Sequence, residues 1–266
     1  MDADLDEMLD AAICAARQAG ALLRLYYERG VVAQHKGAID LVTEADRASE
    51  ALILKMLSEQ FPDHAFYAEE SGASGNHSSH VWVIDPLDGT TNFAHGFPVF
   101  CATLALQIDG RAELGVTFDP LREELFTAQR GRGAFLNDRP IHVSGTPHLS
   151  SSLLVTGFPY DRQTSAHNNL RQHTAMLMKS QGVLRVGSAA LDLASVACGR
   201  LDGFWEFKLS SWDWAAGALL VEEAGGRVTD MSGSRLDPRG RDLVASNGLI
   251  HDGMLDVLRQ TWNDER

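Results

Sequence analysis

The sequence has few cysteines, no long apolar run and no excess of basic residues. Its three cysteines are scattered without the spacing of a metal site or a disulfide framework, which predicts small buried thiols in a reducing compartment: Cys14, Cys101 and Cys198. No uninterrupted apolar segment approaches the roughly 20 residues that span a bilayer. The acidic N-terminus also lacks the basic and apolar profile of a signal peptide. We therefore expect a cytoplasmic protein without membrane contact.

The charge balance is strongly acidic. The chain carries 36 Asp and Glu against 23 Lys and Arg, a formal net charge of −13, whereas nonspecific binding to nucleic acid needs a basic face. An acidic protein also repels a phosphorylated substrate, and bound divalent cations would remove that repulsion locally. The patterns G-x-S-x-G, Walker A and C-x-x-C are missing, so serine-nucleophile hydrolysis and nucleotide-driven transfer have no support.

Apolar periodicity predicts helices and strands that alternate in layers. The expected helices are 5–27, 45–57, 163–180, 189–198, 212–224 and 252–262. The expected strands are 101–108, 112–118, 125–128, 134–136, 141–143, 153–157 and 202–207, with a hairpin turn at Asp109-Gly110. Residues 71–80, rich in Ser, Gly and His, are typical of a mobile surface loop.

The most informative segment is 81–92, with the sequence VWVIDPLDGTTN. Its apolar half predicts a buried strand that ends in a tight turn at DPLDG. Asp85 and Asp88 can converge at the end of such a strand, and the oxygens of two close carboxylates suit Mg²⁺ or Mn²⁺. Gly89 and Thr90 supply N–H and hydroxyl groups for a phosphate. Taken alone, an Asp-Gly pair is most often only a turn; with both acids, the segment indicates metal-assisted phosphoryl chemistry.

Other acidic residues allow two interpretations each. Glu69 lies in a Glu-Glu pair that could be a solvated turn or part of a site. Asp213, between two tryptophans, fits the first turn of a helix, but such surroundings also imply a buried carboxylate that needs a partner. Thr43 and Asp46 fit a capping box, while Asp46 could instead orient the Thr90 hydroxyl toward a water nucleophile.

Several segments match one family, in order along nearly the whole chain. They are DLVTEAD at 40–46, AEES at 68–71, WVIDPLDGTTN at 82–92, GRGAFLN at 131–137, GSAALD at 187–192 and WDWAAG at 212–217, which runs into EAGG at 223–226. On these motifs the chain resembles the inositol monophosphatases, a family of lithium-sensitive, Mg²⁺-dependent phosphatases. The resemblance implies a layered αβαβα sandwich of mixed α+β and α/β type. It also implies a homodimer, and a site between an N-terminal α+β lobe (1–142) and a C-terminal α/β lobe (143–266) that form one catalytic unit.

The resemblance also implies roles for individual residues. Two to three Mg²⁺ ions, with Mn²⁺ as a possible substitute, would be held by Glu69, Asp85, the Leu87 carbonyl, Asp88 and Asp213. The catalytic residues would be Asp46, Thr90 and Glu69, of which the first two activate the attacking water. Substrate contacts would come from Lys36, Asp88, Gly89, Thr90, Ala189, Glu206 and Asp213. The implied reaction is direct hydrolysis of a phosphate monoester without a phosphoenzyme.

The implied substrate is a phosphorylated polyol, most simply inositol 1-phosphate. Relatives of the same fold cleave histidinol phosphate, the 3′-phosphate of phosphoadenosine nucleotides, or fructose bisphosphate. Glu206 favours a polyol because a carboxylate accepts hydrogen bonds from vicinal hydroxyls and repels a second phosphate. A different class of function also stays open, because some bacterial relatives are similar to factors that associate with the transcription machinery.

Overall fold

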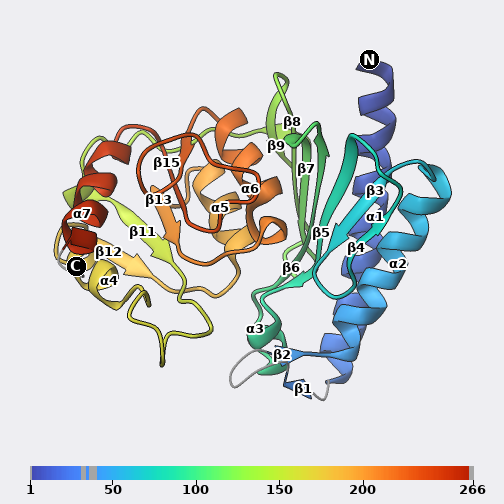
Figure 1. Ribbon diagram of the computed structural model, residues 1–266, viewed down its shortest axis with the longest axis horizontal. Helices are drawn as coiled ribbons and strands as arrows, with labels where there is room; N and C mark the ends of the chain where they lie inside the picture. The colour runs from blue at the N-terminus through green and yellow to red at the C-terminus, as the bar shows by residue number, and fades with distance from the viewer. Residues whose placement is uncertain (1, 31–33, 36–40, 264–266) are drawn as a thin grey trace.

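The computed structural model describes residues 2–30, 34–35 and 41–263, which form five layers of helices and sheets (Figure 1). The helices are α1 (Asp2–Arg29), α2 (Glu44–Gln60), α3 (Thr90–Ala94), α4 (Leu170–Leu177), α5 (Ala189–Ala197), α6 (Ser211–Glu223) and α7 (His251–Asn263). The strands are β1 (Gln34–His35), β2 (Leu41–Val42), β3 (Ala65–Ala68), β4 (Gly72–Gly75), β5 (His80–Asp88), β6 (Cys101–Ile108), β7 (Arg111–Asp119), β8 (Glu124–Gln129), β9 (Gly133–Leu136), β10 (Arg139–Pro140), β11 (Leu153–Thr156), β12 (Gly182–Leu184), β13 (Gly203–Glu206), β14 (Arg227–Thr229) and β15 (Leu243–Ser246).

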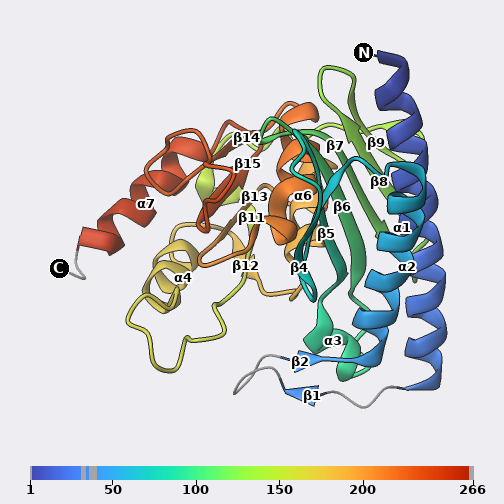
Figure 2. The same cartoon turned by 45° about the vertical axis from the view of Figure 1, so that its right-hand side comes forward.

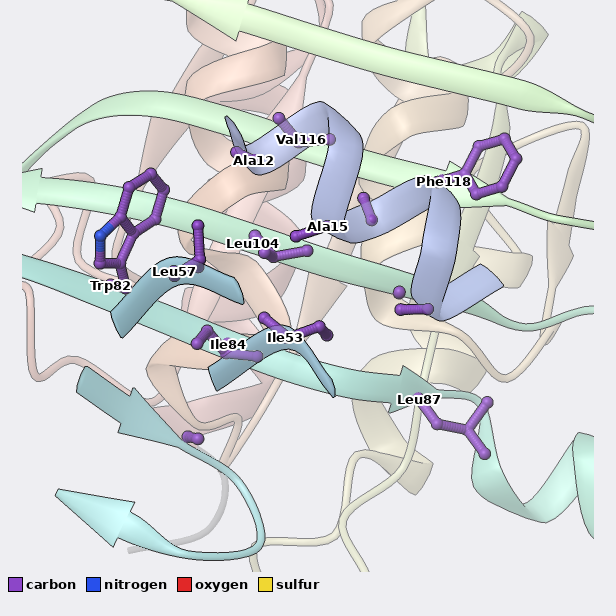
Figure 3. Packing of buried hydrophobic residues seen from close by; sticks show 14 of the residues in the cluster. Ala12, Ala15, Ile53, Leu57, Trp82, Ile84, Leu87, Leu104, Val116 and Phe118 are labelled. Atoms are coloured by element: carbon purple, nitrogen blue, oxygen red, sulfur yellow. The ribbon is translucent and has the colours of Figure 1, made fainter. Parts of the chain in front are cut away.

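The first two layers are a helix pair and a large sheet. The sheet has eight strands in the order β10-β9-β8-β7-β6-β5-β3-β4. Strands β3 and β5 run parallel to each other, and the other neighbouring strands are antiparallel. Ile53 and Leu57 of α2 are fully buried. They lie over Ile84 of β5 (Figure 3). Small residues on α1, such as Ala12 and Ala15, allow close packing of that helix on the sheet.

The other face of the large sheet is covered by α5 and α6, which also pack against a second sheet. This smaller sheet has the order β12-β11-β13-β15-β14, with β11 parallel to both β12 and β13. Because α6 lies between two sheets, residues all round it are buried, among them Trp214, Leu219 and Val221. Helices α4 and α7 contact each other and form the outermost layer (Figure 2). The helix–sheet–helix–sheet–helix order implied by the family resemblance is confirmed.

Most of the expected elements are present. The strand 101–108 is β6, and the hairpin to β7 turns at Asp109 and Gly110, whose φ angles of 51° and 77° are the left-handed values that such a turn requires. The proposed lobes at 1–142 and 143–266 stay a prediction, although each sheet is formed from one of these segments. Within the described residues, no helix combines the length and apolar character of a membrane span.

Four local expectations are wrong. Residues 72–75 are not loop but the edge strand β4, paired with β3 although Gly-Ala-Ser-Gly has little strand propensity. Residues 141–143 form no strand: the Ile141 and Val143 N–H groups donate to different partners, Ala134 O and Ala224 O, so no ladder develops. The helix expected at 163–180 is only α4. Cys14 is exposed, because it lies on the solvent face of α1, and not buried.

His251 makes the stability of the fold depend on pH. Its imidazole is fully buried, with Nε2 2.9 Å from Thr229 Oγ1 and Nδ1 2.9 Å from Ser246 Oγ. Burial, followed by the charge of Arg227, lowers the pKa of His251 to about 4. The unfolded chain therefore binds this proton first, and the free energy of unfolding should fall as pH decreases from about 6.5 toward 4, by up to about 1.4 kcal/mol per pH unit.

Denaturant unfolding at several pH values, compared with His251→Gln, checks this expectation. The glutamine variant should be less stable at pH 7.5 but should lose part of the pH dependence between 7 and 4. An unchanged pH dependence in the variant would show that His251 does not contribute.

Candidate functional site

The site begins where strand β5 ends. The strand continues through Pro86 and ends at Asp88, within the DPLDG segment where the sequence predicts its end. A shift of register lies between Asp85 and Asp88, and such a bulge accommodates the proline. Gly89 follows with φ 96° and caps the short helix α3. A Cβ at Gly89 would lie 2.9 Å from the Val99 carbonyl oxygen, so both conformation and space require glycine.

Asp46 forms the capping box and also contacts Thr90. Its Oδ2 accepts hydrogen bonds from the Thr43 N–H (2.8 Å) and hydroxyl (2.6 Å), which completes the capping box of α2. Its Oδ1 accepts a hydrogen bond from Thr90 Oγ1 at 3.1 Å. The Thr90 hydroxyl also lies 3.0 Å from the Leu87 carbonyl oxygen. Asp46 is fully buried, and its hydrogen bond to Thr90 connects it to a residue that lines the cavity.

Asp88 connects segments that are 100 residues apart. Its Oδ2 accepts hydrogen bonds from Ser188 Oγ (2.6 Å) and from the Ala190 N–H (2.7 Å). Ser188 is the N-cap of α5, and Ala189 and Ala190 are the first residues of that helix. A carboxylate is favourable at this position because a helix N-terminus carries partial positive charge. The contact brings α5 to the end of β5.

Four carboxylates gather around this point. Burial, and next the charge of Glu69, raise the pKa of Asp85 well above its ordinary value; Asp88 and Asp213 raise it further. Burial and then the charge of Asp88 raise the pKa of Asp213 well above its ordinary value in the same way. Asp213 is placed by the first turn of α6, where its Oδ2 accepts the Ser210 N–H at 2.6 Å. Such mutual repulsion would be relieved by a cation.

The donor set fits a hard divalent cation, because it consists of carboxylate and carbonyl oxygens. As these side chains stand, no group of three or more His, Cys, Asp or Glu in the described part of the chain is arranged to hold a metal ion. Three of these acids are held in place by backbone N–H groups: Asp85 Oδ1 accepts the Leu87 N–H at 3.0 Å, Asp88 Oδ2 accepts the Ala190 N–H, and Asp213 Oδ2 accepts the Ser210 N–H.

A cavity of about 490 Å³ opens beside these acids. The expected site residues that line it are Asp88, Gly89, Thr90, Ala189, Glu206 and Asp213. Asp46 and Leu87 lie behind Thr90, whereas Glu69 and Asp85 contribute through their charge on the neighbouring acids. Lys36 lies outside the described residues. The structure thus brings together residues from both sheets and from three helices.

Glu206 lines this cavity at the end of β13. Burial, followed by the charge of Asp88, raises the pKa of Glu206 to about 8, and Arg185 opposes this shift. The carboxyl is therefore largely neutral near pH 7, and in this form it can both donate and accept hydrogen bonds. A cation nearby would lower this pKa.

Gly157, Arg185 and Asp192 are among the further cavity residues that were not expected as site residues from the sequence. Asp192 is 3% exposed, and burial followed by the charge of Glu206 raises its pKa well above the ordinary value. A carboxylate inside the otherwise apolar segment 189–198 was the signal that could have identified it. Gly157 and Arg185 carry no comparable local signal.

Comparison with known proteins identifies the class to which this fold and this acidic cavity belong. A profile described as "Inositol monophosphatase family" matches residues 4–263. The chain belongs to this family, and it is a phosphatase that hydrolyses phosphorylated substrates.

Individual relatives agree with this assignment. The chain is 48% identical over 260 residues to the inositol-1-monophosphatase of Synechocystis sp., covering 97% of this chain and 91% of that protein. It is 46% identical over 262 residues to the Nus factor SuhB of Pseudomonas aeruginosa, covering 96% of this chain and 97% of that one. The solved structure of inositol monophosphatase from Anabaena (Nostoc) sp. superposes with a TM-score of 0.89 at 47% identity, covering 97% of each chain.

Proposed function

We propose that the protein hydrolyses inositol 1-phosphate to inositol and inorganic phosphate. The observation that supports this most directly is the cavity, whose lining combines acids and the turn at Gly89 and Thr90 with Glu206. The acids and the turn suit a phosphate with its cations, and Glu206 suits the hydroxyls of a polyol. Phosphate release from inositol 1-phosphate with Mg²⁺ tests this function, and no release would refute it.

The residues around the metal ions and the phosphate each have a proposed role. Glu69, Asp85, Asp88, Asp213 and the Leu87 carbonyl would hold two to three Mg²⁺ ions, with Mn²⁺ as the alternative. When bound, the metal supplies positive charge that stabilises the phosphate and the leaving oxygen. Li⁺ is proposed to inhibit the enzyme by occupying one of these metal sites in place of Mg²⁺. Lys36 is proposed to reach the substrate from outside the described residues, and Ala189 and Gly89 to border it.

Thr90 and Asp46 are proposed to prepare the attacking water. When the Thr90 hydroxyl donates to Asp46 Oδ1, its lone pairs face away from that carboxylate and can accept a hydrogen bond from water. The proton can then pass through the hydroxyl to Asp46, whose pKa is raised by burial. This pair thereby orients the water and removes its proton.

Glu206 should set the choice of substrate. Loss of a hydrogen bond between a substrate hydroxyl and this half-buried carboxyl costs roughly 1.5–3 kcal/mol, which corresponds to roughly ten- to a hundredfold. Glu206→Ala should therefore lower kcat/KM for inositol 1-phosphate by that factor and have a much smaller effect on p-nitrophenyl phosphate, which has no hydroxyls to bind. Steady-state kinetics with both substrates measure the difference.

Equal losses with both substrates would indicate that Glu206 serves the metal site or the fold instead. Retention of full activity with both would remove the main support for a polyol substrate. Asp138→Asn is a suitable control, since this exposed acid lies on a turn between β9 and β10 and its φ of 62° is one that asparagine adopts readily.

A binding role in transcription is the second candidate. The similarity to the Nus factor SuhB of P. aeruginosa, at 46% identity over 96% of this chain, favours it. The retained acidic cavity argues that such a role would accompany catalysis and not replace it. A pull-down from cell lysate, run beside a phosphate-release assay, separates the two. We also propose a cytoplasmic homodimer, as the family resemblance implies.

A further inference from the structure

Gly157 and Glu206 lie side by side at the ends of two parallel strands. The register of β11 and β13 pairs Thr156 with Trp205, so the next residue of each strand reaches the cavity at the same level. The two residues are in close contact. A Cβ added at Gly157 would overlap both carboxyl oxygens and the carboxyl carbon of Glu206. The Glu206 carboxyl therefore occupies the space that any other residue at position 157 would fill.

The backbone of Gly157 is held in place from behind. Asn169 is fully buried, and its Nδ2 donates to the Gly157 carbonyl oxygen at 2.6 Å and to Thr156 Oγ1 at 2.8 Å. Its Oδ1 accepts the Trp205 indole N–H at 2.7 Å. This network ties β11 to β13, so the peptide at Gly157 cannot easily move away from Glu206.

Conformation does not explain the glycine. The φ angle of Gly157 is not positive, so alanine can adopt the same backbone conformation. The three atoms nearest to such a Cβ all belong to the end of the Glu206 side chain. The flexible Glu206 side chain can rotate away. We therefore expect Gly157→Ala to leave the fold intact but to move the Glu206 carboxyl from its observed position.

We propose that Gly157 is a positioning residue that determines substrate specificity by leaving room for the Glu206 carboxyl in the cavity, where it can bind the hydroxyls of a polyol. This inference rests on the proposed polyol phosphatase function. Its basis is steric: the strand pairing places the two residues together, Asn169 fixes the backbone, and the missing side chain leaves the Glu206 carboxyl its place.

A double-mutant cycle with Gly157→Ala and Glu206→Ala tests the proposal. The readout is kcat/KM for inositol 1-phosphate divided by kcat/KM for p-nitrophenyl phosphate. Gly157→Ala should lower this ratio by roughly tenfold, since it displaces the group that binds the hydroxyls. Adding Gly157→Ala to Glu206→Ala should cause almost no further loss, because the displaced carboxyl is already gone.

Gly182→Ala provides the matched control. Gly182 lies in the same sheet, on β12, and an added Cβ would make only an ordinary contact of 3.4 Å with Leu153 Cδ1. This variant should keep the wild-type ratio, and thermal unfolding should show that both alanine variants are folded. Additive losses in the cycle, an unchanged ratio in Gly157→Ala, or equal loss with both substrates would overturn the proposal.

The cycle also separates this proposal from the proposed function. Wild-type protein that does not cleave inositol 1-phosphate refutes the function itself. The same cycle is then measured with the phosphate monoester that the wild-type protein cleaves fastest, and additivity with that substrate overturns the role of Gly157.

Discussion

Phosphate release should stop in excess chelator, and Asp85→Asn should lower kcat by several orders of magnitude while the protein stays folded. Asp85 is 2% exposed and feels the charges of three other acids, so its own charge is costly unless a cation is present. Asparagine keeps an oxygen that can accept the Leu87 N–H, now 3.0 Å from Asp85 Oδ1, but provides no charge for the cation. Without metal, the variant should be at least as stable as the wild type.

Assays with added Mg²⁺, with chelator and after restoring Mg²⁺ measure this dependence, beside thermal unfolding of the metal-free proteins. Asp138→Asn, which makes the same chemical change on an exposed turn, should leave both activity and stability close to those of the wild type. Activity that persists in excess chelator would contradict the metal-based account of this site.

Thr90→Ala should lower kcat by roughly 10²–10⁴, the range for loss of a positioned acid–base group. The variant removes the hydroxyl that lies 3.1 Å from Asp46 Oδ1 and 3.0 Å from the Leu87 carbonyl oxygen. Thr90→Ser keeps this hydroxyl and should retain most of the activity. The loss should appear in kcat more than in KM, because the substrate phosphate keeps its other contacts.

A second variant separates catalysis from helix capping. Thr43→Ala removes the hydroxyl that bonds to Asp46 Oδ2 and accepts the Ala45 N–H, and it should reduce stability by about 1 kcal/mol. Its effect on kcat should be far smaller than that of Thr90→Ala. If Thr90→Ala and Thr90→Ser were equally impaired, the hydroxyl would not be the functional group, and the proposed Thr90–Asp46 pair would be wrong.

The centre of the candidate site can be proposed from the sequence because its parts are local. Asp85, Asp88 and Thr90 lie within six residues of one another, and the capping box of Thr43 and Asp46 spans four positions. Short-range patterns of this kind are visible without knowledge of the fold. The five-layer arrangement, by contrast, was expected from family resemblance and not from periodicity alone.

The rest of the cavity depends on contacts between distant segments. Gly157 meets Glu206 only because β11 pairs with β13, and Asn169 supports this contact from a turn before α4. No spacing in the sequence indicates such neighbours. The edge strand β4 was missed for a similar reason, since its Gly-Ala-Ser-Gly sequence becomes a strand only by pairing with β3.

The most direct test of the proposed function is a panel of phosphate-release assays with Mg²⁺. The substrates are inositol 1-phosphate, histidinol phosphate, 3′-phosphoadenosine 5′-phosphate and fructose 1,6-bisphosphate, and kcat/KM is compared across them. We predict the highest value for inositol 1-phosphate, because Glu206 offers hydrogen bonds to neighbouring hydroxyls and no positive charge for a second phosphate. A higher kcat/KM for histidinol phosphate or for either bisphosphate would contradict this assignment.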